Sequence, residues 1–146
     1  MSKCERFAGR LLGLALSAIT AASITYAGAL RADEVMVTLS GNQEIPPVTT
    51  SATGTGTLSV GSDKSISGKL EVAGMTPTVA HIHEGAPGAN GPIIVPLTKV
   101  SDGVWAVPAG AKLTDAQFES YRSGKLYFNV HSEAHRSGEI RGQIKP

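Results

Sequence analysis

The 146-residue sequence contains one cysteine, Cys4, and none after it. A domain formed by the rest of the chain therefore cannot be held by disulfide bonds, and it offers no thiolate for a zinc or blue-copper site. The chain also lacks a charge bias, since 13 Lys and Arg oppose 12 Asp and Glu. Nucleic-acid binding proteins normally present a basic face, so this balance argues against nucleic acid as a partner.

No apolar run approaches the ~20 residues that a transmembrane helix needs. The strongly apolar part, residues 11–19, follows three basic residues and precedes a run of small ones. A basic start, a short apolar run and an A-x-A site are typical of a secretory signal peptide. We therefore predict a signal peptide over residues 1–32, cleaved after Ala29 or Ala32. The mature domain, residues 33–146, is expected to be exported, periplasmic or extracellular, with no membrane span.

Short segments of alternating apolar and polar residues dominate the mature chain. In residues 65–72, for example, Ile66, Leu70 and Val72 share one face, which is the period of a half-buried strand. Turn residues separate such segments. Strands are predicted at residues 35–39, 54–60, 65–72, 79–83, 93–97, 104–107, 126–131 and 139–144.

One helix is expected between the last strands. Thr114 and Gln117 have the spacing of a capping box, and Gly124 would end the helix after about two turns. Many short strands with one small helix predict an all-β fold, an antiparallel Greek-key β-sandwich or barrel of a single domain.

The four histidines are His81, His83, His131 and His135. His81 and His83 are two apart on a predicted strand, so both project from its outward face. His131 projects from the outward face of a later strand, and the following turn can bring His135 back toward it. Imidazole is the usual protein ligand of copper, zinc and non-haem iron, so this pattern predicts a four-histidine metal site. Unrelated surface or hydrogen-bonded histidines are the alternative.

Neighbouring polar residues suggest supporting roles. Glu84, Asn129 and Glu133 are expected to accept hydrogen bonds from the ring N–H groups of the ligands. Arg141 lies on the outer face of the last predicted strand. We expect it to pair with Glu139 or another carboxylate or, near a metal, to attract an anion.

Two catalytic interpretations lack the motifs that they need. The glycine-rich segment 85–92 has neither the Lys nor the helix of a phosphate-binding loop. Ser132 lies beside His131 but has no nucleophile elbow and no orienting carboxylate at a defined spacing. A hydrolase is therefore not favoured.

Four segments resemble the signatures of the CHRD domain, a module named after chordin. They are residues 39–48 (LSGNQEIPPV), 80–92 (AHIHEGAPGANGP), 126–135 (LYFNVHSEAH) and 138–144 (GEIRGQI). The resemblance extends over residues 35–144 and implies one secreted β-sandwich domain. It implies less about activity: in animals the domain occurs in an antagonist of bone morphogenetic proteins, whereas short single-domain forms are typical of microbes.

The segment HIHE, residues 81–84, is also similar to the copper-binding strand of Cu/Zn superoxide dismutases. These enzymes are Greek-key sandwiches whose copper lies outside the barrel under loops, so an immunoglobulin-like or dismutase-like architecture is expected. The similarity implies copper ligation by His81 and His83. It also implies a catalytic role for Arg141 as the anion-guiding arginine. His131 and His135 complete the ligands by count. No histidine remains for a separate zinc site, which implies a copper-only centre.

Two functions follow as hypotheses. The first is an exported CHRD protein that binds one metal ion, copper or as second choice zinc, and that dismutates superoxide if the metal turns over. The alternative is a non-catalytic extracellular module that binds a protein or glycan through segment 85–92 and edge strands, with no metal. Monomer and homodimer both remain open, because edge strands can pair between copies.

Overall fold

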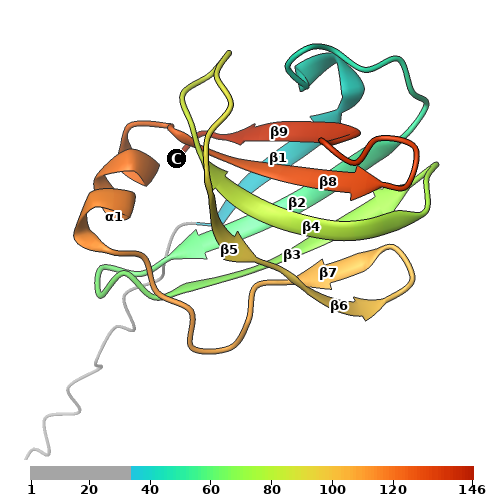
Figure 1. Cartoon of the computed structure of the whole chain (residues 1–146). Helices are drawn as coiled ribbons and strands as arrows, with labels where there is room; N and C mark the ends of the chain where they lie inside the picture. The colour runs from blue at the N-terminus through green and yellow to red at the C-terminus, as the bar shows by residue number, and fades with distance from the viewer. Residues whose placement is uncertain (1–33) are drawn as a thin grey trace, which may run out of the picture.

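The computed structural model describes residues 34–146 (Figure 1). The predicted signal peptide and its cleavage sites lie outside these described residues. No helix described within them is long and apolar enough to cross a membrane. The elements are β1 (Glu34–Ser40), the 3-10 turn η1 (Gly41–Gln43), β2 (Thr53–Val60), β3 (Ile66–Ala73), β4 (Pro77–Glu84), β5 (Ile93–Pro96), β6 (Thr98–Ser101), β7 (Val104–Ala106), α1 (Asp115–Arg122), β8 (Leu126–Ser132) and β9 (Ile140–Ile144).

The strands form one antiparallel sheet in the order β5-β4-β8-β9-β1-β2-β3-β7-β6 (Figure 1). Its two ends, β5 and β6, are separated along the chain by Leu97 alone. The Leu97 N–H donates to the Ala80 carbonyl at 2.9 Å, after which the chain leaves β4 and pairs with β7. The sheet is therefore a nearly closed barrel. This confirms the predicted all-β antiparallel fold with one short helix.

Apolar side chains at every second position of the strands fill the barrel interior. Leu126, Phe128 and Val130 of β8 are fully buried, and the intervening residues belong to the outward face. Opposite Phe128 lies Gly56 of β2, where an added Cβ would come within 2.9 Å of the phenyl ring. The Gly-Thr alternation of β2 thus leaves space in the core for a large side chain from another strand.

Helix α1 packs at one end of the barrel and supports the end of β4. Thr114 and Gln117 form both hydrogen bonds of the predicted capping box. The left-handed conformation of Gly124, with φ of 67°, lets the chain turn into β8. Ser120 donates to the Glu84 carboxylate at 2.6 Å, which links the helix to the last residue of β4. This hydrogen bond holds the end of β4, from which loop 85–92 begins.

One strand was not predicted from the sequence. All four residues of β6 are exposed, so this segment has no apolar alternation that would mark it. Its only signal is the turn at Asp102 and Gly103, which joins it to β7. The position of this terminal strand of the sheet therefore depends on its pairing with β7 rather than on its own side chains.

Candidate metal centre

Strands β4 and β8 bring three histidines together on the outward face of the barrel. In the β4–β8 register, His81 lies opposite Asn129, and His131 lies opposite Val79. His81, His83 and His131 each offer a ring nitrogen, and these nitrogens all lie within 4.8 Å of one another. The period-two argument thus correctly places the histidines of the two strands on one face. We call these three residues the histidine cluster.

Two rings of the cluster have the spacing of ligands on one metal. His81 Nδ1 lies 3.1 Å from His131 Nε2. Two nitrogens that bind one tetrahedral metal at about 2.1 Å are separated by roughly 3.4 Å. The cluster can therefore accept an ion with small side-chain adjustments.

Backbone carbonyls fix the tautomers of the other ring nitrogens. A carbonyl can only accept, so His83 Nδ1 donates to the Gly91 carbonyl and His131 Nδ1 donates to the Arg136 carbonyl, each at 2.9 Å. In neutral rings this leaves both Nε2 atoms with a lone pair. The Nε2 of His83 is buried and has no hydrogen-bond partner within the described residues. Such an atom is rare in a folded protein and has the electronic form of a metal ligand.

The sequence-based assignment of the hydrogen-bond acceptors is wrong. For His83 and His131 the acceptors are the backbone carbonyls, whereas the three expected side chains have other partners. Glu84 accepts from Ser120, the Asn129 amide donates to the Glu44 carboxylate and the Ile140 carbonyl, and Glu133 pairs with Arg136.

Electrostatics favours the neutral form of His81 and His83. Burial, together with the neighbouring His131 and His83, lowers the pKa of His81 to about 4. Burial also lowers the pKa of His83, with smaller contributions from His131 and Arg141, although its hydrogen bond to Gly91 opposes the shift. Only neutral imidazole has a lone pair for a metal. Both rings are therefore neutral at neutral pH, and each keeps one nitrogen lone pair. Because the Nε2 of neutral His131 can only accept, His81 Nδ1 donates to it, and an ion bound at this position would displace that proton.

The fourth histidine lies outside the cluster. The backbone N–H of His135 donates to Ser132 Oγ at 3.1 Å. An electrostatic interaction with His135 contributes to the lowered pKa of Glu139 and opposes the rise in the pKa of Glu44 that burial causes. The turn that was expected to return His135 to His131 thus directs its side chain toward two carboxylates.

Arg141 is almost completely buried, with 2% of its surface exposed. The expectation that it pairs with Glu139 or another carboxylate is wrong, because within residues 34–146 Arg141 forms no ion pair and Glu139 accepts from Thr50. Its guanidinium instead donates to Gln143 and to three acceptors of loop 85–92, and lies 3.5 Å from the ring centroid of Tyr127. This placement favours a structural role.

The sequence analysis did not identify Tyr127 as part of the site. The Tyr127 ring stacks on His83, with centroids 4.9 Å apart and planes 13° apart. Its hydroxyl accepts from the Gly91 N–H at 3.1 Å. The sequence offered one indication of this role: Tyr127 and His131 lie an even number of positions apart, so both side chains lie on the same face of β8.

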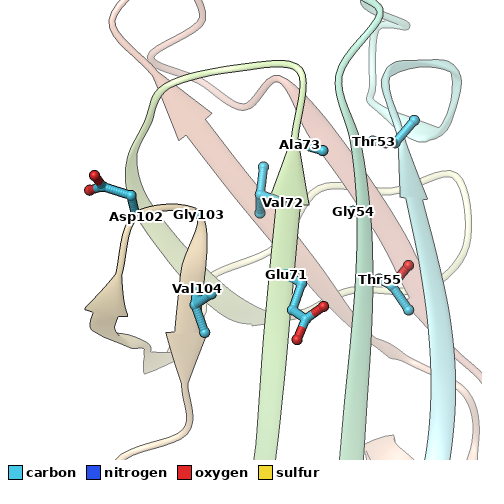
Figure 2. A pocket seen from close by; sticks show the side chains of 9 residues that line it. All are labelled: Thr53, Gly54, Thr55, Glu71, Val72, Ala73, Asp102, Gly103 and Val104. Atoms are coloured by element: carbon cyan, nitrogen blue, oxygen red, sulfur yellow. The ribbon is translucent and has the colours of Figure 1, made fainter.

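A groove of about 430 Å³ lies elsewhere on the surface, where β2 and β3 approach the β6–β7 turn (Figure 2). Its two carboxylates already have partners: Glu71 pairs with Lys69, and Asp102 pairs with Lys99. Figure 2 shows these carboxylates pointing in different directions. None of the predicted site residues lines the groove, so it is not part of the candidate metal centre.

Comparison with known proteins gives one match. The family model of the CHRD domain matches residues 35–144, a range that includes all four histidines and Arg141. Neither curated proteins nor solved structures give a match.

Proposed function

The chain belongs to the CHRD family, and from this premise and the histidine cluster we propose that it binds one transition-metal ion. The ligands are His81, His83 and His131. Copper is the preferred ion and zinc the second choice. Residues 1–32 direct export, so the site operates in the periplasm or outside the cell.

The observation that carries this proposal is the unpartnered Nε2 of His83. A buried acceptor without a hydrogen bond costs about 1–3 kcal/mol. Here that atom belongs to a cluster of three nitrogen donors, and the opposite nitrogen of the same ring is already bonded to a carbonyl. A metal ion would satisfy the atom and would use all three rings at once.

The donor set supports copper or zinc. Imidazole nitrogen suits both ions, and the cluster contains no thiolate and no carboxylate. Three protein ligands leave a coordination position open for water or a small substrate. With copper held by the three histidines, this open position would admit superoxide, and the copper would supply one-electron redox chemistry of the kind that dismutates superoxide to O₂ and H₂O₂.

The test uses protein expressed from the full 146-residue sequence and purified without a histidine tag. Elemental analysis after reconstitution is expected to show about one copper or zinc per chain, and electron paramagnetic resonance (EPR) of Cu(II) to show a nitrogen-rich signal. His83→Gln and His131→Gln should each raise the copper Kd at least ~10-fold, because each removes one ligand.

His135→Gln is the matched control, because it changes the histidine outside the cluster, and it should bind copper like the wild type. Loss of copper in this variant would instead support the four-histidine set. Protein that takes up neither copper nor zinc would overturn the proposal and leave the partner-binding module. A copper-loaded protein without dismutase activity would limit the function to metal storage or buffering.

A further inference from the structure

We infer that Arg141 is a positioning residue for the proposed metal site. Acting through loop 85–92 and Tyr127, it fixes the tautomer and orientation of His83 and thereby directs Nε2 at the metal. This inference rests on the proposed function only for the identity of the ligand, since the hydrogen bonds that carry it belong to the metal-free protein.

Arg141 holds the loop from the opposite side of β8. Loop 85–92 leaves the end of β4, whereas Arg141 belongs to β9, and β8 lies between these two strands. The Nη2 group donates to the carbonyls of Ala86 and Ala89, at 3.3 and 2.9 Å, and Nη1 donates to Asn90 Oδ1 at 3.2 Å. These acceptors immediately precede Gly91 in the chain. The guanidinium therefore determines where Gly91 lies.

The position of Gly91 in turn fixes the hydrogen-bond acceptor of His83. Its carbonyl accepts from His83 Nδ1, and its N–H donates to the Tyr127 hydroxyl. A Cβ at Gly91 would lie 1.7 Å from the Glu84 carbonyl oxygen, so only glycine fits where the loop crosses the end of β4. The Gly91 carbonyl has little freedom to point elsewhere while the loop is held.

The second support of His83 is the ring of Tyr127. His83 stacks on this ring, and the guanidinium of Arg141 contacts the same ring from the neighbouring strand. Both supports of the imidazole, the carbonyl at Nδ1 and the stacked ring, are thus in contact with Arg141 or with the loop that it holds.

The choice of tautomer has a chemical consequence. A neutral imidazole carries its proton on either nitrogen, and only the Nδ1–H form leaves Nε2 free for a metal. If the loop moves, His83 loses the acceptor that selects this form. Lysine would keep the positive charge of Arg141, but its single ammonium group cannot reproduce the planar fork that serves several acceptors. Arg141→Lys therefore separates positioning from charge.

The first measurement is the long-range ¹H–¹⁵N spectrum of the imidazoles in the full, metal-free protein. The wild type should show His83 as the Nδ1–H tautomer, and R141K should show a mixture. The second measurement is copper binding. R141K should raise the copper Kd by about 10- to 100-fold and broaden or shift the Cu(II) EPR signal. Arg122→Lys, at an exposed position on α1, is the control and should change neither.

A folded R141K with wild-type tautomer and wild-type EPR signal would overturn the inference. If R141K does not fold, Asn90→Ala decides, because it removes one acceptor and leaves Arg141 in place. A partial tautomer shift in this variant supports the inference, and an unchanged tautomer contradicts it. Wild-type protein that binds no copper would refute the metal site alone, since the tautomer measurement does not require an ion.

Discussion

Glu44 shows how strongly one buried residue depends on its surroundings. Its carboxyl accepts from the Asn129 amide and is almost completely buried. Burial raises its pKa above the usual 4.5, although the hydrogen bond from Asn129 and the charge of Arg141 oppose the shift. A carboxyl with a raised pKa stabilises the folded state most below pH 4.5, and this contribution is lost as pH rises through the folded pKa.

We predict that Glu44→Gln is at least as stable as the wild type at pH 7. Glutamine removes the buried charge, and its Oε1 can still accept from Asn129. The advantage should disappear below pH 4.5, where Glu44 itself is protonated. Urea unfolding at pH 7 and pH 4 measures the difference in unfolding free energy.

The pKa of Glu139 is shifted in the opposite direction from that of Glu44. Burial favours its neutral form, but hydrogen bonds from Ser132 and Thr50 outweigh this and lower its pKa below 4.5. Its contribution to stability is present above pH 4.5 and is lost as pH falls through the folded pKa. Glu139→Gln should therefore lose about 1 kcal/mol at pH 7 and less at low pH. If the change in unfolding free energy depended on pH in the same way for Glu44→Gln and Glu139→Gln, the opposite pKa shifts of the two carboxyl groups would be contradicted.

At the scale of elements, the loop between β4 and β5 offers two glycines for comparison. An alanine Cβ at Gly91 would collide with the Glu84 carbonyl, whereas at Gly88 it would meet no atom within 4 Å and only the φ of 80° opposes it. We predict that Gly88→Ala loses about 1–2 kcal/mol of unfolding free energy from backbone strain. It should bind copper normally.

Gly91→Ala should lose more stability and also raise the copper Kd at least ~10-fold, because the displaced loop no longer accepts from His83. Urea unfolding and copper titration of both variants provide the measurement. Equal copper affinities for the two alanine variants would show that the loop does not determine the geometry of the cluster.

Strands with alternating apolar residues could be predicted from the sequence, whereas an exposed strand and the backbone acceptors of the histidines could not. Alternation identified β3, β4 and β8 because each directs apolar side chains at every second position into the barrel interior, and the same period of two placed His81 and His131 on a common face. It could not identify β6, which has no buried side chain. Nor could it identify the acceptors of the ring N–H groups. Every residue has a backbone carbonyl, and only the folded loop shows that those of Gly91 and Arg136 are used.

The direction of the His135 side chain could not be predicted from the strand period either. It follows the end of β8 by three residues, beyond the range of the strand period, and hydrogen bonds of the turn decide its direction. A count of histidines predicted four ligands. The geometry of the turn brings only three into the cluster.

For the whole molecule, the closure of the barrel depends on Leu97. It is the single residue between β5 and β6, and its side chain is buried in the core. Leu97→Ala is predicted to lose about 2–5 kcal/mol, because it leaves a cavity where the two ends of the sheet meet. Val100→Ala, at a position of β6 that is 64% exposed, should change stability by less than about 0.5 kcal/mol.

Urea unfolding of both variants tests this prediction. Equal losses for Leu97→Ala and Val100→Ala would mean that closure contributes little to stability.

The same closure has a consequence for the chemical environments in which the fold can persist. Small exported domains often tie distant strands together with a disulfide, a bond that reductants break. Here the strands β4 and β7 are tied by the peptide backbone that runs from β5 through Leu97 into β6. Residues 34–146 contain no cysteine, so no thiol chemistry forms or breaks this connection. The barrel can therefore assemble and persist equally well under oxidising and reducing conditions.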